Sequence, residues 1–104
     1  MMSDKPGGKE LKVPNMSYVV SIFKVMSDET RLSILWLLSQ GEWCVHHLAE
    51  ALDTSVSNIS HHLRLLRASR LVKSRREGQK VYYSLDDEHV VRLLDEAFEH
   101  AQHG

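Results

Sequence analysis

Apolar residues recur at helical spacing through the first part of the chain. Residues 15–26 place Tyr18, Ile22 and Met26 on one side of a predicted helix. Ser27 or Asp28 then provides an N-cap for a second helix, which carries a dense apolar run and ends near Gly41. The first forty residues therefore predict two consecutive helices.

A second pair of helices is predicted from the next stretch. Residues 45–52 form a short helix, residues 53–55 form a turn rich in capping side chains, and residues 55–68 form a longer helix with Ile59, Leu63 and Leu66 facing inward. Two helices joined by so short a turn are typical of a helix-turn-helix.

The pattern changes to alternation after this unit. Residues 71–75 and 81–85 alternate apolar and polar side chains around a turn at 77–79 that contains Gly78, which predicts a β-hairpin. Asp86 or Asp87 then caps a last helix that extends to about His103. The predicted fold is mainly α with a β-hairpin wing, a winged helix-turn-helix that forms a homodimer through its N- and C-terminal helices.

The length of 104 residues suits one domain. Residues 1–14 lack periodicity and contain two prolines and two glycines, so we expect a flexible N-terminal arm followed by a single domain over 15–104. The polar start lacks a secretory signal, and no apolar run approaches the roughly 20 residues of a membrane span, so we expect a soluble cytoplasmic protein. Cys44 is the only cysteine, which excludes an intrachain disulfide.

Charge is segregated along the chain although the net charge is only −1. The stretch from 64 to 80 holds seven basic residues and one acid, Glu77, whereas the stretch after 85 is acidic and has one arginine, Arg92. This separation indicates one surface for phosphates and another for cations.

The start of the second helix of a helix-turn-helix enters the DNA major groove. Here that segment is polar and is followed by basic residues on the same helix and on the wing, so the predicted partner is double-stranded operator DNA. The expected contacts are Ser57, Asn58, Ser60, His61, Arg64, Arg67, Arg75, Arg76, Gln79 and Lys80.

The last helix carries a spaced set of metal-ligand residues, Asp87, His89, His100 and His103. His100 and His103 are three residues apart and share a helical face. His89 and His100 are eleven residues apart, or about 16 Å along a helix axis, whereas zinc ligands lie about 2 Å from the ion. One helix cannot bring both pairs to one ion, but an antiparallel copy from a second subunit can, and two-fold symmetry then creates two equal sites.

Three imidazoles and one carboxylate suit four-coordinate zinc, and tetrahedral cobalt fits as well. Cadmium, lead or arsenic would prefer several thiolates, and the chain has one. A second cluster of Cys44, His46 and His47 lacks partners on the N-terminal arm. We interpret it as a buried cysteine beside surface histidines, with a second metal site as the alternative.

Three segments and the ligand pattern carry a resemblance to a known family. The segments are SDETRLSILWLL, LAEALDTSVSNISHHLRLLRASRLV and SRREGQKVYYSLDD. Over about residues 20–103 the chain is similar to the ArsR/SmtB family of metal-sensing repressors, and most like its zinc and cobalt sensors. The resemblance implies an apo dimer that represses at an operator and is released by metal, controlling its own gene and a gene for metal efflux or sequestration. It places the ligands on Asp87, His89, His100 and His103, and it implies that His100 also donates its other ring N–H to the backbone carbonyl of Arg70.

Two other function classes compete with this reading. A zinc enzyme needs an open coordination position and a nucleophile-and-base pair, and the sequence offers neither. A DNA-binding protein whose last helix only dimerises would bind no zinc. Nickel stands beside zinc and cobalt as a candidate physiological metal.

Overall fold

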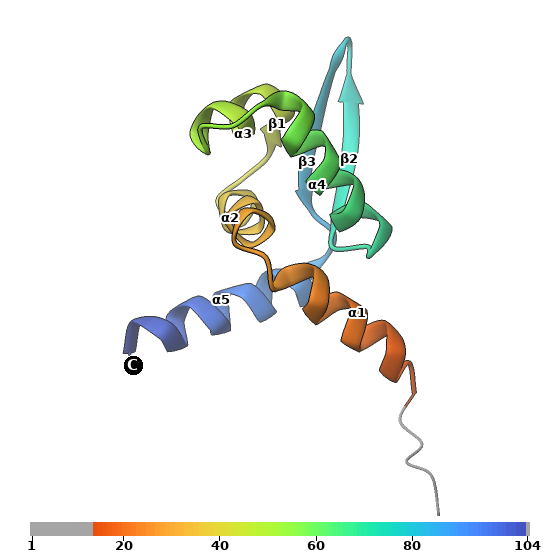
Figure 1. Ribbon diagram of the computed structural model, residues 1–104, viewed down its shortest axis with the longest axis vertical. Helices are drawn as coiled ribbons and strands as arrows, with labels where there is room; N and C mark the ends of the chain where they lie inside the picture. The colour runs from red at the N-terminus through yellow and green to blue at the C-terminus, as the bar shows by residue number, and fades with distance from the viewer. Residues whose placement is uncertain (1–13, 104) are drawn as a thin grey trace, which may run out of the picture.

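The structure is a computed structural model that describes residues 14–103. It is mainly helical, and its elements follow the predicted order of a winged helix-turn-helix (Figure 1). They are α1 (Met16–Met26), α2 (Glu29–Leu38), β1 (Trp43–Cys44), α3 (Val45–Ala51), α4 (Val56–Ala68), β2 (Val72–Glu77), β3 (Lys80–Leu85) and α5 (Glu88–His103). The predicted arm over 1–14 lies outside the described residues except for Pro14.

Side-chain caps fix the starts of the helices that matter for function. Oδ2 of Asp28 accepts the backbone N–H of Arg31 at 3.0 Å and begins α2. Oγ of Ser55 accepts the backbone N–H of Asn58 at 3.0 Å and begins α4. Each cap satisfies one of the backbone donors that a helix start leaves without an intrahelical partner, so the sequence sets these boundaries locally.

The wing is larger than the hairpin that alternation predicts. β2 and β3 pair from Val72↔Leu85 to Glu77↔Lys80, which leaves a two-residue turn in which Gly78 has a φ of 65°. The ladder continues beyond the apolar positions because backbone pairing at an exposed tip needs no buried side chains. β1 pairs with β3 and adds a third antiparallel strand in the order β1-β3-β2, a strand of two residues that the pattern did not reveal.

The core lies where the helix-turn-helix meets α2 and the base of the wing. Buried leucines and isoleucines from α2, α3 and α4 pack with Val72, Leu85 and, from α5, Leu94. Burial at this scale supplies the main favourable free energy of folding. It also holds α4 and the wing in a fixed relation.

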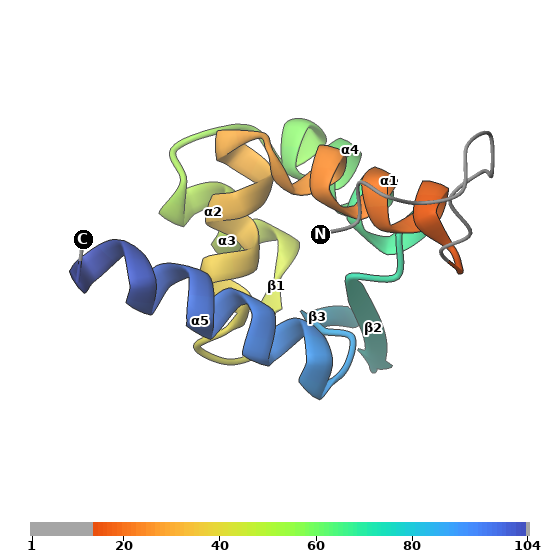
Figure 2. The same ribbon diagram turned by 90° about the horizontal axis from the view of Figure 1, so that it is seen from below.

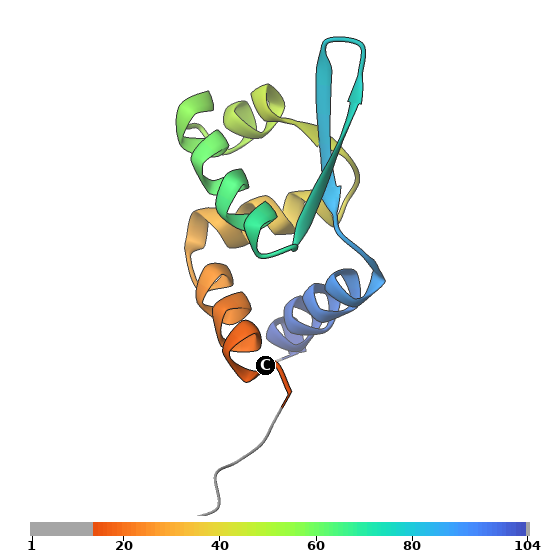
Figure 3. The ribbon, with the colours of Figure 1, turned by 90° about the vertical axis from the view of Figure 1, so that its right-hand side faces the viewer.

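Helices α1 and α5 lie at the end of the molecule opposite the tip of the wing (Figures 1 and 3). The C-terminal end of α5 projects past α2, and residues 99–103 are exposed (Figure 2). The basic tip of the wing and the acidic helix α5 therefore occupy opposite ends of the fold. Among residues 14–103, no helix has the length and apolar character needed to cross a membrane.

Candidate functional site

Helix α4 presents the polar residues that the sequence assigns to DNA. Those with exposed side chains are Ser57, His61, Arg64 and Arg67, and those that are half-buried are Asn58 and Ser60. The buried residues Ile59, Leu63 and Leu66 occupy the opposite face and anchor α4 to the core. The helix therefore offers a polar, basic face to a ligand, with its position set by packing.

Two side chains near the start of α4 are held by neighbouring elements. Nδ2 of Asn58 donates to Oγ1 of Thr54 at 3.1 Å, which ties the helix to the preceding turn. Nη1 of Arg31 on α2 donates to Nδ1 of His62 at 3.2 Å. Arg31 is a site-supporting residue that the sequence did not single out, because a contact across 31 positions leaves no local signal.

A groove runs between α4 and the wing. Its part near α4 holds about 400 Å³ and is lined by Ser60, Arg64 and Arg67. Its part near the wing holds about 460 Å³ and is lined by Arg67, Arg75 and Arg76. Tyr83 of β3 lies in both parts. We call this feature the α4–wing groove. Four guanidinium groups line this groove, and guanidinium groups attract phosphate oxygens.

Arg75 on the wing forms ion pairs with Glu42 and Glu77. Its guanidinium is 2.8 Å from carboxylate oxygens of Glu42 and of Glu77, and it lies over the ring of Tyr82 at 4.9 Å from the centroid. The hydrogen bonds to Glu42 and then to Glu77 raise the pKa of Arg75 above its ordinary value, and Arg75 in turn lowers the pKa of Glu42. This pairing fastens the wing to the loop before β1. Gln79 and Lys80 are exposed at the tip of the wing.

Two of the four predicted metal ligands, Asp87 and His89, lie together at the start of α5. Oδ1 of Asp87 accepts the backbone N–H groups of His89 and Val90 at 2.9 and 3.1 Å and so caps the helix. Oδ2 of Asp87 lies 3.6 Å from Nδ1 of His89. The bond from Val90 is the main cause that lowers the pKa of the Asp87 carboxyl, and an ionised carboxylate is the form that binds metal. The carboxylate and the imidazole therefore sit side by side.

The other two predicted ligands lie at the far end of the same helix. His100 and His103 are exposed in the last turn of α5. No group of three or more Asp, Glu, His or Cys side chains within residues 14–103 of one chain is arranged to hold a metal ion. The donors still fit zinc by chemistry, because they are one carboxylate and three imidazoles. Completing a site needs both ends of α5 together, as the helix arithmetic requires.

The remaining predicted residues occupy distinct places. Cys44 is buried and precedes α3 without a side-chain capping bond, while His46 and His47 are exposed on α3. Arg70, the residue whose carbonyl was implied as a partner of His100, follows α4 with a φ of 58°. In one chain the C-terminal end of α5 points away from the end of α4 (Figures 1 and 2).

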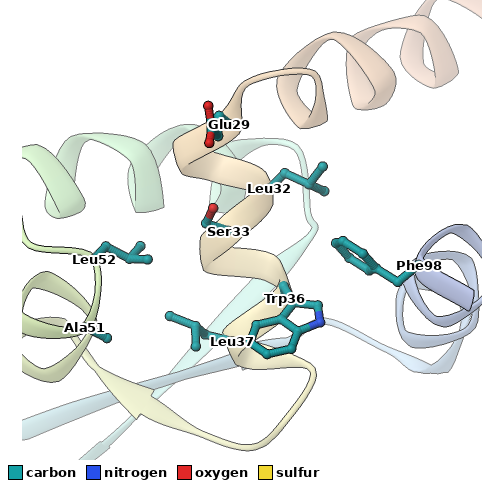
Figure 4. A pocket seen from close by; sticks show the side chains of 8 residues that line it. All are labelled: Glu29, Leu32, Ser33, Trp36, Leu37, Ala51, Leu52 and Phe98. Atoms are coloured by element: carbon teal, nitrogen blue, oxygen red, sulfur yellow. The ribbon is translucent and has the colours of Figure 1, made fainter. Parts of the chain in front are cut away.

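An apolar pocket of about 470 Å³ lies apart from these residues, between α2, α5 and the end of α3 (Figure 4). Trp36 and Phe98 face one another across it, and its polar side chains are those of Glu29 and Ser33. It contains neither a nucleophile-and-base pair nor a set of metal donors. The groove and the helix ends are therefore the stronger candidates for function.

Comparison with known proteins identifies relatives of the whole chain. Residues 28–74 match the family model for bacterial regulatory proteins of the arsR family. The chain is 47% identical over 93 residues to a cadmium resistance transcriptional regulatory protein CadC homolog of Staphylococcus aureus, covering 88% of the chain and 77% of that protein. It is 45% identical over 84 residues to a transcriptional repressor SmtB homolog of a Synechocystis species, covering 81% of the chain and 64% of that protein.

A solved structure agrees with these relatives. The homodimeric winged helix-turn-helix DNA-binding domain of a possible ArsR-family transcriptional regulator from Mycobacterium bovis superposes with a TM-score of 0.82 at 33% identity. The match covers 94% of this chain and 91% of that domain. The predicted fold and the predicted family are both confirmed.

Proposed function

Because the chain belongs to the ArsR family of bacterial transcriptional repressors, close to its metal-responsive members, we propose that it is a zinc-responsive operator-binding homodimer. The family is one of transcriptional regulators and not of enzymes. In the proposed function the metal-free dimer represses genes for metal efflux or sequestration, and zinc, or cobalt in its place, releases it from DNA.

The α4–wing groove supports the DNA-binding part of the proposal. Ser57, Asn58, Ser60 and His61 would read base edges from the first turns of α4. Phosphate contacts would come from Arg64, Arg67 and Arg76 in the groove and from the exposed Gln79 and Lys80 at the tip of the wing. Arg75 would add less, because any phosphate must compete with Glu42 and Glu77 for its guanidinium.

Exposed apolar side chains on α1 and α5 support the dimer. Met16, Val19, Val20 and Phe23 on α1 are between 41% and 54% exposed, and Leu93 on α5 is 38% exposed. The four residues of α1 share one face of that helix, and an exposed apolar face of this kind marks a protein interface more often than a solvated face. A second copy of the chain is the proposed occupant, since the relative from Mycobacterium bovis is a homodimer.

The two ends of α5 support the metal site. An antiparallel α5 from the partner would bring its His100 and His103 to Asp87 and His89 of the first chain. Zinc bound there would polarise no substrate and would act only by joining two subunits. The donor atoms are imidazole nitrogen and carboxylate oxygen, and zinc binds both. Cadmium is a softer ion and prefers thiolate sulfur to these donors. A bond from His100 to the carbonyl of Arg70 would also need the partner, since the C-terminal end of α5 points away from the end of α4 in one chain.

The observation that carries the proposal is the cap at the start of α5, where Oδ2 of Asp87 and Nδ1 of His89 lie 3.6 Å apart and the hydrogen bond from Val90 lowers the pKa of the Asp87 carboxyl. We propose measuring binding to an operator duplex selected from a random library, with zinc chloride and then with a chelator. Zinc should weaken operator binding by about 5- to 150-fold, the range of ordinary allosteric coupling, and the chelator should restore it.

Two controls sharpen this experiment. The variant His46→Ala/His47→Ala removes exposed histidines elsewhere and should keep the zinc response. The variant His100→Ala/His103→Ala should bind operator normally and lose the response. Equal operator affinity with and without zinc in the unmodified protein would contradict a metal-sensing role and leave a repressor without this effector.

A further inference from the structure

Tyr18 on α1 reaches across the molecule to the end of α4. Its hydroxyl donates to the backbone carbonyl of Ser69 at 2.9 Å, over a separation of 51 residues. The same hydroxyl accepts from Nε of Arg70 at 3.3 Å, and the Arg70 guanidinium lies 5.0 Å from the centroid of the Tyr18 ring. One phenol therefore bonds two consecutive residues as both donor and acceptor.

This contact lies where α4 needs an outside partner. The last carbonyls of a helix have no intrahelical donor. Two of these carbonyls receive backbone donors that follow the helix: the N–H of Arg70 donates to the Arg67 carbonyl, and the N–H of Leu71 donates to the Leu66 carbonyl. The left-handed φ of 58° at Arg70 accompanies this ending. The Ser69 carbonyl is the group that Tyr18 satisfies. The orientation of the last turn is thus tied to α1.

Tyr18 is also the point at which the first half of α1 meets the rest of the chain. Among residues 14–20 it is the one residue that is half-buried, and the others are exposed. The exposed residues include Met16, Val19 and Val20, which belong to the proposed dimer surface. Helix α1 therefore has an exposed face that belongs to the proposed dimer surface, and it contacts the end of α4 through Tyr18.

We propose that Tyr18 is a positioning residue for DNA binding, which holds the end of the recognition helix in register with the dimer helix α1. The inference rests on the proposed function. In a symmetric dimer the two recognition helices must reach half-sites about one helical turn of DNA apart. Their relative placement depends on how each α4 is joined to the helices at the interface. The Tyr18 hydroxyl is a direct bond between the two.

The test compares two variants on the same helix. Tyr18→Phe keeps the ring and removes the hydroxyl, whereas Ser21→Ala removes a hydroxyl that bonds only to the Tyr18 carbonyl within α1. Tyr18→Phe removes both bonds of the hydroxyl and should weaken binding to the selected operator duplex by at least about 2- to 10-fold, the factor that one lost hydrogen bond gives. Its affinity for random duplex and its salt dependence should stay unchanged, because the phosphate-binding arginines are intact. Ser21→Ala should match the unmodified protein in both.

Arg70→Lys gives a second arm, because it keeps the charge and loses the Nε–H that faces the hydroxyl. It should show a smaller operator defect than Tyr18→Phe, because the bond from the Tyr18 hydroxyl to the Ser69 carbonyl remains. The double variant Tyr18→Phe/Arg70→Lys should lose little more than Tyr18→Phe alone, since Tyr18→Phe already removes the bond from Arg70. Additive losses, or equal losses on operator and random duplex, would overturn the positioning role.

Hydrogen exchange in the free protein separates this inference from the proposed function. Tyr18→Phe should speed amide exchange in the last turn of α4 and in Arg70, and Ser21→Ala should not. Unchanged exchange in Tyr18→Phe would overturn the inference whether or not DNA binds. Failure of the unmodified protein to select any DNA sequence, with the exchange result as expected, would instead overturn the proposed function.

Discussion

Arg31 of α2 holds His62 of α4 through a hydrogen bond of 3.2 Å from Nη1 to Nδ1. Arg31 has only donors, so Nδ1 must carry a lone pair and the proton of a neutral His62 sits on Nε2. Nε of the same guanidinium donates to the carbonyl of Val25 at 2.7 Å at the end of α1. One arginine therefore joins three helices, and its bond to His62 requires the neutral imidazole.

This relationship predicts an acid-sensitive fold. Burial lowers the pKa of His62, and Arg31 and His61 lower it further, while Asp28 opposes them. Protonation thus favours the unfolded chain, so this contribution is complete above the ordinary histidine pKa of about 6.5 and is lost as the pH falls from there towards the lower folded value. The cap to Arg31 lowers the pKa of Asp28, and that contribution is lost at more acidic pH, as the carboxyl protonates.

Urea unfolding at a series of pH values from about 7.5 to about 5.5 checks the histidine effect. The midpoint should fall with pH in the unmodified protein and fall less in His62→Gln, whose side-chain oxygen can still accept from Arg31. His61→Gln, the exposed neighbour, should behave like the unmodified protein. A decline in His62→Gln as steep as in the unmodified protein would place the sensitivity elsewhere.

Adjacent arginines on the wing should differ in their effect on DNA binding. Both Arg75 and Arg76 line the α4–wing groove, and the two differ in the ion pairs that Arg75 makes. Arg76→Gln should weaken all DNA binding and flatten the plot of log affinity against log salt by about 0.9, the value for one phosphate contact. Arg75→Gln should change the slope by less than half as much, because Glu42 and Glu77 already hold its charge. Equal slopes for the two variants would show that DNA displaces these carboxylates.

The shared metal site predicts complementation between defective chains. One chain carries Asp87→Asn/His89→Ala, in which asparagine keeps the helix cap, and the other carries His100→Ala/His103→Ala. Each homodimer should bind no tight zinc, whereas the mixed dimer should bind one ion, because one of its two sites holds all four unmodified ligands. Zinc titration of the three dimers by calorimetry measures the stoichiometry. Tight zinc in either homodimer would mean that a site forms without both helix ends.

Cys44 should be dispensable for the metal response. It is buried next to the core and its sulfur caps nothing, so Cys44→Ser should cost about 1 kcal/mol of stability through burial of a hydroxyl and leave zinc-driven release intact. Release assays on the selected operator, with thermal unfolding alongside, separate the two effects. A variant that binds zinc but stays on DNA would move the sensing role to Cys44, His46 and His47.

Local patterns predicted most of this molecule. Helix boundaries at Asp28 and Ser55 follow from capping, which involves neighbouring residues, and the structure confirms them. The sequence pattern did not predict the strand β1, because two residues are too few to show an alternation of apolar and polar side chains. The hydrogen-bonded pairs Glu42–Arg75 and Tyr18–Ser69 join residues that are 33 and 51 positions apart. They form only after the chain folds, so no local sequence pattern predicts them.

The backbone at Arg70 has a consequence for anyone who would engineer this protein. A left-handed conformation costs a residue with a side chain roughly 1 kcal/mol, and glycine adopts it freely. A thermostability design guided by helix-ending rules would choose Arg70→Gly first, and the melting temperature would rise. The same change would remove the guanidinium that lies against Tyr18. If Tyr18 positions α4 as we propose, Arg70→Gly should raise the melting temperature and weaken operator discrimination together.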